Sequence, residues 1–155
     1  HFGRLDGLVH CAADFPGLTP FEQADPALFA RALHVTLTSP AWLLQACLPL
    51  LRRQSDAAIV LCMDDPARVG AAYWGGYGVA QHGLRGLLAS LHDELRNGPV
   101  RVSGLQPGPM RTALRARAWS LDEDDRAGEP ASAAAKAVHL LSAAGAGARG
   151  TVSAL

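Results

Sequence analysis

Short apolar segments alternate along this chain with longer stretches that are apolar at helical spacing. The apolar segments cover residues 5–13, 57–63 and 100–105, and the first of them is apolar on both of its faces. A strand that is buried on both faces is typical of a parallel sheet, because helices pack against each side of such a sheet. The sequence therefore predicts an α/β fold in which a parallel sheet is connected by right-handed crossovers.

Two long helical patterns connect these strands. The first begins at Asp25-Pro26, an N-cap acceptor followed by proline at the first helical position, and continues to about residue 53. Pro40 lies within it, and we expect a kink there because proline lacks an N–H group and clashes with the preceding turn. The second pattern covers about residues 74–97. The remaining elements expected are an acidic loop at 122–125, an alanine-rich helix at 129–144 and a last strand at 151–155.

Charge and cysteine content exclude several classes of function. The 14 basic and 14 acidic side chains give a net charge of zero, so the sequence offers no electrostatic case for binding nucleic acid or an anionic membrane. No apolar stretch is as long as a membrane span, and no signal peptide is recognisable. Cys11, Cys47 and Cys62 are odd in number and far apart, and the histidines lack ligand spacing. We therefore expect one cytoplasmic domain with no disulfide framework and no metal.

One glycine motif has the wrong surroundings for a dinucleotide site. Gly145, Gly147 and Gly150 match G-x-G-x-x-G. A dinucleotide fingerprint must follow a strand and open a helix, because the helix N-terminus binds the pyrophosphate. Here the motif follows an expected helix and precedes an expected strand, which indicates a chance match.

The most informative stretch surrounds Tyr77. Tyr77 and Gln81 are four residues apart on an expected helix and project from one side of it, near the carboxyl ends of the strands. Residues 72–83 resemble the short-chain dehydrogenase/reductase family, whose members carry Tyr-x-x-x-Lys at this point. Residues 10–13 (His-Cys-Ala-Ala) stand where the family has Asn-Asn-Ala-Gly, and residues 107–112 (Pro-Gly-Pro-Met-Arg-Thr) match its Pro-Gly-x-x-x-Thr.

The resemblance implies a Rossmann-like, doubly wound parallel sheet. Residues 1–155 would then be a single partial domain that supplies strands four to seven and lacks the first three, together with the glycine-rich turn for the pyrophosphate. A first residue that is not Met agrees with a fragment, and the first strand would be an exposed sheet edge. The implied cofactor is NAD(P). The cofactor-binding residues implied are Cys11, Ala12, Ala13, Pro107, Gly108 and Thr112.

The resemblance also implies a catalytic set of which only the tyrosine is kept. Family members use the tyrosine as acid or base, a lysine to lower its pKa, a serine to orient the carbonyl group and an asparagine in a proton relay. Tyr77 is in place, but Gln81 stands at the lysine position. Asp64 stands at the serine position, thirteen residues before the tyrosine, and Thr36 stands at the asparagine position. A neutral amide carries no charge to stabilise a tyrosinate and a carboxylate opposes it, and Lys136 lies on a distant helix, so we expect little or no hydride transfer.

Three functions stay open at this point. The chain is the C-terminal part of an NAD(P)-dependent oxidoreductase that acts on a carbonyl or an alcohol, a non-catalytic pseudo-enzyme that binds or dimerises, or a gene remnant. In the family the two long helices, here about residues 26–53 and 74–97, commonly pair across a dimer axis. Trp42, Leu44, Leu88 and Leu91 would supply apolar surface for a homo-oligomer, unless the same residues pack within the chain. The loop at about residues 114–127 is expected to set the choice of substrate.

Overall fold

The computed structural model describes residues 2–118 and 127–155 of the chain. Within these ranges a parallel sheet has its strands in the order β1-β2-β3-β4. The strands are β1 (Gly7–His10), β2 (Ala57–Cys62), β3 (Val100–Gln106) and β4 (Val152–Ala154). The predicted α/β fold with a parallel sheet is confirmed.

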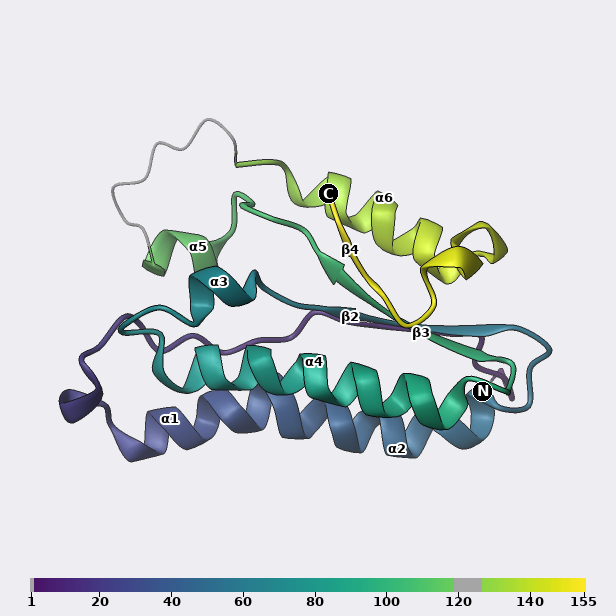
Figure 1. Cartoon of the computed structure of the whole chain (residues 1–155), viewed down its shortest axis with the longest axis horizontal. Helices are drawn as coiled ribbons and strands as arrows, with labels where there is room; N and C mark the ends of the chain where they lie inside the picture. Colours follow the sequence, from purple (N-terminus) through teal and green to yellow (C-terminus); the bar gives the residue numbers. More distant parts are fainter. Residues whose placement is uncertain (1, 119–126) are drawn as a thin grey trace.

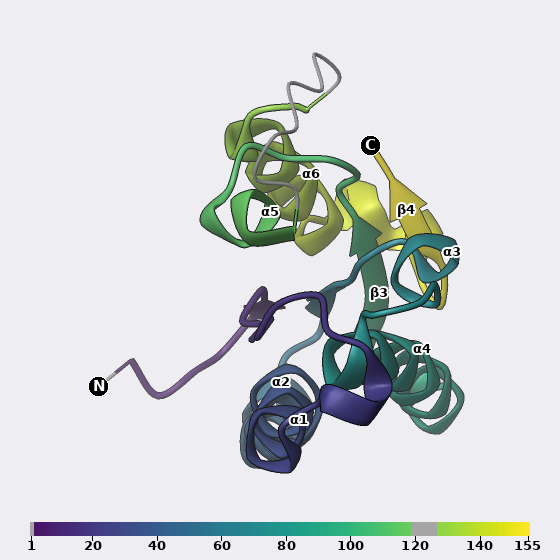
Figure 2. The same cartoon turned by 90° about the vertical axis from the view of Figure 1, so that its left-hand side faces the viewer.

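Helices cover both faces of the sheet (Figure 1). On one face lie α1 (Pro26–Leu33), α2 (Ser39–Leu51) and α4 (Gly75–Leu95), and on the other lies α6 (Pro130–Leu141). Figure 2 shows the helices on the two faces from the end of the molecule, with α1 and α2 packed beside α4. The short helices are η1 (Phe21–Gln23), α3 (Pro66–Val69), α5 (Ala113–Ala118) and η3 (Ala143–Ala148).

The central strand β2 shows why the segment at 57–63 has no polar face. Ile59 and Leu61 are fully buried in a cluster that contains side chains of α2 and α4. Val60, which points to the opposite face, is buried against Leu140 of α6. Since successive side chains alternate between two covered faces, every position of the strand is apolar.

The long helix before β2 changes its winding immediately before Pro40. Asp25 caps it as predicted, because the Asp25 carboxylate accepts a hydrogen bond of 2.7 Å from the N–H of Ala27. Between α1 and α2 lies a π-helical turn, η2 (His34–Thr38), in which the Ser39 N–H donates to the carbonyl of His34. A π-helical turn holds one extra residue, so it accommodates a proline that cannot donate to the preceding turn. The expected distortion at Pro40 therefore takes the form of a π-helical turn in one continuous helix.

The expected alanine-rich helix and last strand are present with shifted boundaries. The alanine-rich helix ends at Leu141, and Gly145 and Gly147 lie in η3, after a helix and before a strand, as the chance match requires. The acidic run at 122–125 lies outside the described residues. In the described parts of the chain, no helix combines the length and the apolar character needed to cross a bilayer.

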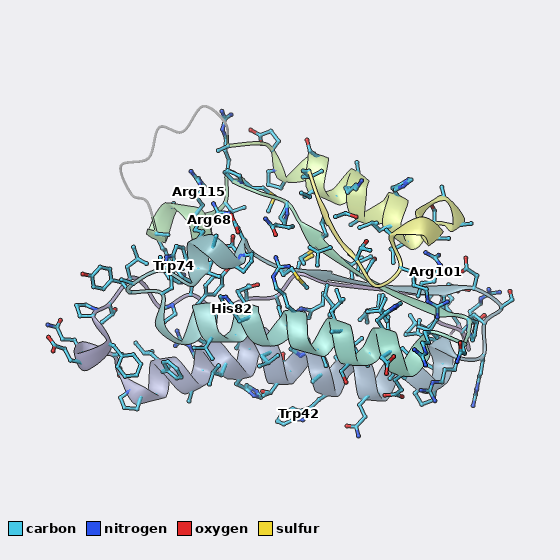
Figure 3. All side chains as sticks on the ribbon, in the orientation of Figure 1. Trp42, Arg68, Trp74, His82, Arg101 and Arg115 are labelled. Carbon is cyan, nitrogen blue, oxygen red and sulfur yellow. The ribbon has the colours of Figure 1, made fainter. Side chains whose placement is uncertain are left out.

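Apolar residues expected on a dimer surface are mostly part of the core of the chain itself. Leu44, Leu88 and Leu91 are buried in the cluster between the sheet and the helices α2 and α4. Trp42 is 61% exposed and points away from the sheet (Figure 3). Intramolecular packing thus accounts for three of these four residues, and pairing of the helices across a dimer axis stays a prediction.

Glycines at the start of α4 allow this helix to approach its neighbours closely. A Cβ atom on Gly76 would lie 2.8 Å from the carbonyl oxygen of Phe29 in α1, and one on Gly78 would collide with the carbonyl oxygen of Val69 in α3. A Cβ atom on Gly86, two turns further along α4, would meet no atom within 4 Å. The close approach at the start of α4 fixes how deeply Tyr77, which lies between these two glycines, is buried.

Two alanine substitutions on α4 should therefore have opposite effects on stability. Gly78→Ala should lower the free energy of unfolding by about 1–3 kcal/mol, because the added methyl group overlaps a backbone carbonyl. Gly86→Ala should raise it by about 0.5–1 kcal/mol, because the methyl group enters open space and restricts the unfolded chain. Urea unfolding of the two variants and the parent measures both changes. Equal effects of the two substitutions would contradict the packing described for α4.

Candidate functional site

A pocket of about 420 Å³ opens at the carboxyl ends of β1, β2 and β3. Its size lies within the usual range of about 300–1,000 Å³ for small-molecule sites, and its location is where open α/β sheets bind ligands. The predicted site residues that line it are Cys11, Ala13, Asp64, Tyr77, Gln81, Pro107, Gly108 and Thr112. Ala12 and Thr36 are not among the lining residues.

Tyr77 lies in the first turns of α4 and is 3% exposed. Its ring packs against Phe15 and Trp74, with centroid separations of 5.4 and 5.8 Å. Its hydroxyl group donates a hydrogen bond of 3.2 Å to Oδ2 of Asp64. The residues predicted for the tyrosine and serine positions are therefore in direct contact.

Gln81 is buried one turn after Tyr77 and holds the chain that follows β2. Its Oε1 atom accepts a hydrogen bond of 2.9 Å from the backbone N–H of Asp64, and the whole residue is 4% exposed. The amide nitrogen carries two further donors, which a lysine ammonium would replace by three donors and a positive charge. The oxygen of Gln81, the residue predicted for the lysine position, is thus already engaged.

Two arginines that sequence reasoning missed hold Asp64 in place. Nη2 of Arg68, on α3, donates to Oδ1 of Asp64 at 2.9 Å, and Oδ1 also accepts from the N–H of Asp65 at 2.8 Å. Nη2 of Arg85, on α4, donates to the carbonyl oxygen of Asp64 at 3.3 Å and to Oε1 of Gln106 at 2.7 Å. The spacing of four residues between Asp64 and Arg68 was a usable signal for the first contact.

The surroundings of Tyr77 favour its neutral form. Burial raises the pKa of Tyr77 well above its ordinary range, and the negative charge of Asp64 and its hydrogen bond raise the pKa further. The amide of Gln81 and the guanidinium of Arg68 act in the opposite direction but more weakly. Tyr77 is therefore a neutral hydrogen-bond donor and not a ready base.

Thr36 holds the loop that follows β1, which is called the β1 loop here. It is fully buried in the π-helical turn η2, and its hydroxyl oxygen accepts a hydrogen bond of 3.1 Å from the N–H of Asp14. The Asp14 carboxylate is in turn bound by Arg31 at 2.8 Å. Thr36 thus fixes the segment that carries Cys11 and Ala13 into the pocket.

The segment after β3 leaves room for a ligand. Gly108 has a φ angle of +70°, and a Cβ atom there would meet no atom within 4 Å. The Thr112 hydroxyl oxygen accepts a hydrogen bond of 3.2 Å from the N–H of Arg115, and its proton can be donated elsewhere. Arg115 on α5 and Arg68 on α3 lie at this same end of the sheet (Figure 3). Over residues 2–118 and 127–155, no three His, Cys, Asp or Glu side chains gather in a group that could hold a metal ion.

Comparison with known proteins assigns this arrangement to a family. A family model described as short chain dehydrogenase matches residues 1–123. This chain belongs to the short-chain dehydrogenase family. Among curated proteins, the chain is 30% identical over 131 residues to the uncharacterized oxidoreductase YciK of Escherichia coli K12, which covers 84% of this chain and 52% of YciK. The chain therefore spans about half the length of this curated relative.

Solved structures of short-chain dehydrogenases have the same fold. A short chain dehydrogenase from Salmonella enterica serovar Typhi superimposes with a TM-score of 0.93 at 28% identity, over 99% of this chain and 63% of that one. A short-chain dehydrogenase structure from E. coli CFT073, in complex with NADPH, gives a TM-score of 0.91 at 27% identity, over 99% and 63% of the two chains. The short-chain dehydrogenase resemblance seen in the sequence is confirmed, whereas the roles of the individual site residues stay predictions.

Removing the Thr36 hydroxyl should destabilise the chain through the loop that follows β1. Thr36→Val keeps the shape of the side chain but leaves the N–H of Asp14 without its acceptor, which should cost about 1–3 kcal/mol in the free energy of unfolding. Thr36→Ser keeps the acceptor and should be the more stable of the two variants. Denaturant unfolding measures the difference, and a valine variant as stable as the serine variant would remove the positioning role.

Proposed function

We propose that this chain forms the C-terminal, nicotinamide-binding part of an NAD(P)-dependent oxidoreductase domain, and that its own site does not sustain hydride transfer. The observation that carries the proposal is the hydrogen bond of 3.2 Å between the Tyr77 hydroxyl and Asp64, in a pocket where Gln81 takes the place of a lysine. The family supplies the class of reaction, which is hydride transfer between a nicotinamide and a carbonyl or an alcohol.

The pocket residues fit the nicotinamide end of such a cofactor. Ala13 and Gly108 have small side chains or none, so the floor of the pocket stays open for a flat ring. The Thr112 hydroxyl and the Gln81 amide supply donors for a carboxamide, a phosphate or ribose hydroxyls. Structural neighbours from E. coli CFT073 and Shigella flexneri were solved with NADPH and NADP, which favours NADP(H) as the first cofactor to test.

Proton transfer is the step that the site disfavours. When bound, the reduced nicotinamide supplies a hydride, and the carbonyl oxygen of the substrate then needs a proton. Release of the Tyr77 proton would leave a tyrosinate beside the carboxylate of Asp64, with Arg68 as a cation already paired to that carboxylate. The same carboxylate repels negative charge that develops on the substrate oxygen. These charges favour a pseudo-enzyme that keeps the pocket for binding.

Restoring the two family residues should raise turnover. The double variant Asp64→Ser with Gln81→Lys removes the opposing carboxylate and adds a cation beside Tyr77, so acid–base catalysis should gain about 10²-fold. Reduced nicotinamide mononucleotide is a suitable hydride donor, because the pocket of this chain corresponds to the nicotinamide end. The rate is measured as loss of nicotinamide absorbance in the presence of an activated α-dicarbonyl compound.

A matched control separates local chemistry from net charge. Asp93→Ser with Gln23→Lys makes the same change in net charge at exposed positions and should leave the rate at the parental level. Calorimetry with nicotinamide mononucleotide shows whether the parent binds the ligand without turning it over. A parent chain that is as active as the double variant would contradict the proposed inactivity, and absence of binding in every variant would contradict the assigned pocket.

A further inference from the structure

We propose that Cys11 and Cys62 form a redox-active thiol pair in the wall of the pocket, which a hydroperoxide oxidises to an intramolecular disulfide and a thiol reductant restores. The proposal goes beyond the nicotinamide chemistry, since it needs neither a bound cofactor nor hydride transfer. It rests on the spacing of the two sulfur atoms, on their different exposure and on the strands that hold them.

The fold brings together two cysteines that are 51 residues apart. Their Sγ atoms lie 3.0 Å from each other, and both residues line the pocket as free thiols. His10 of β1 pairs with Leu61 of β2, so Cys11 and Cys62 are the next residues along two adjacent parallel strands. Adjacent strands are about 4.8 Å apart, which falls in the range of about 4.4–6.8 Å that disulfides span between Cα atoms. The backbone therefore needs no large movement to form the bond.

The two thiols differ in a way that assigns their roles. Cys11 is exposed at the end of β1, whereas Cys62 is partly buried and packs against the apolar cluster under α6. The hydrogen bond from Cys62 lowers the pKa of Cys11 to about 7, although burial opposes the shift, and the same contact raises the pKa of Cys62 above its usual range. Cys11 is thus the thiolate that reacts first, and Cys62 is the protonated thiol that resolves the product.

Within residues 2–118 and 127–155, three charged side chains line the pocket that contains the pair. Asp64, Arg68 and Arg115 line the same pocket, and the first two are bound to each other at 2.9 Å. His10 precedes Cys11 on the strand and therefore points to the opposite face of the sheet, where it is buried. The sulfur–sulfur contact is consequently the main influence on the ionisation of Cys11.

The oxidation balances with a hydroperoxide as the only co-reactant. The Cys11 thiolate attacks one oxygen of hydrogen peroxide and the O–O bond breaks. Cys11 becomes a sulfenic acid and hydroxide is the leaving group. The sulfur of Cys62 gives up its proton and attacks the sulfur of Cys11, so the S–S bond forms while the S–O bond breaks and water departs. The hydroxide takes up the proton that Cys11 lost on ionisation, so two thiols are oxidised by two electrons in total and one peroxide is reduced to two molecules of water.

Cys47 provides an internal control. It lies on α2 and packs against the apolar cluster on the α4 face of the sheet, whereas Cys62 packs against the cluster on the α6 face. An intramolecular bond between Cys47 and either pocket cysteine would have to cross the sheet. Cys47→Ser should therefore leave the oxidation of the pair unchanged.

The reduced chain is treated with one equivalent of hydrogen peroxide, and its thiols and linked peptides are identified by mass spectrometry. We expect two thiols to be lost per chain, a peptide link between Cys11 and Cys62, a free Cys47, and full recovery after dithiothreitol. Cys62→Ser should form no link and should leave a sulfenic acid on Cys11 that dimedone traps. Three free thiols after treatment, a link only between chains, or over-oxidised Cys11 beside a free Cys62 would each overturn the proposal.

The rate of alkylation of Cys11 by iodoacetamide tests the contact separately in Cys47→Ser chains. Cys62→Ala removes the donor and should slow alkylation of Cys11 at neutral pH by at least about tenfold, because less of the thiol is ionised. Cys62→Ser keeps a hydroxyl donor at the same place and should retain much of the parental rate. Equal rates in the alanine variant and the parent would show that the two sulfurs are not in contact, which would overturn the proposed pair.

Discussion

Parallel pairing of β1, β2 and β3 places the carboxyl ends of three strands at one edge of the sheet. The pocket opens there, and its walls come from segments that are far apart in the sequence, such as Cys11 after β1, Asp64 after β2 and Thr112 after β3. Helix α4 then passes beneath this edge and presents Tyr77 and Gln81 from one of its faces. A shift of one residue in the register of any strand would turn its side chains to the other face and dismantle the site.

The charges around Tyr77 determine which protonation state of its hydroxyl group is favoured. A lysine beside the tyrosine would favour the tyrosinate, whereas the groups present here, Asp64 with its partner Arg68 and the neutral Gln81, favour the protonated tyrosine. Asp64 accepts hydrogen bonds from Tyr77 and Arg68, and its backbone N–H donates to Gln81, so these groups hold one another in fixed positions. Membership of the short-chain dehydrogenase family therefore describes the fold and the location of the pocket, while binding without turnover stays a proposal that depends on the residues in the pocket.

Much of the fold could be predicted because burial leaves a pattern in the sequence. The segment of β2, covered on both faces, is apolar throughout, and the family resemblance placed Tyr77 and Asp64 among the site residues. The thiol pair could not be predicted, because the meeting of Cys11 and Cys62 depends on the register of two strands joined by a long crossover. The role of Thr36 was also hidden, since only the tertiary structure shows that its hydroxyl holds the β1 loop.

The ionisation of Tyr77 can be measured directly by nuclear magnetic resonance of ¹³C-labelled tyrosine in a Tyr73→Phe chain, which leaves Tyr77 as the single tyrosine. The structure predicts that the Tyr77 ring signal stays in its neutral form past the ordinary tyrosine pKa of about 10, as long as the chain remains folded. Adding Asp64→Ser should bring the transition to lower pH. Ionisation of Tyr77 at or below the ordinary value in the parent sequence would contradict the conclusion that Asp64 and burial keep this tyrosine neutral.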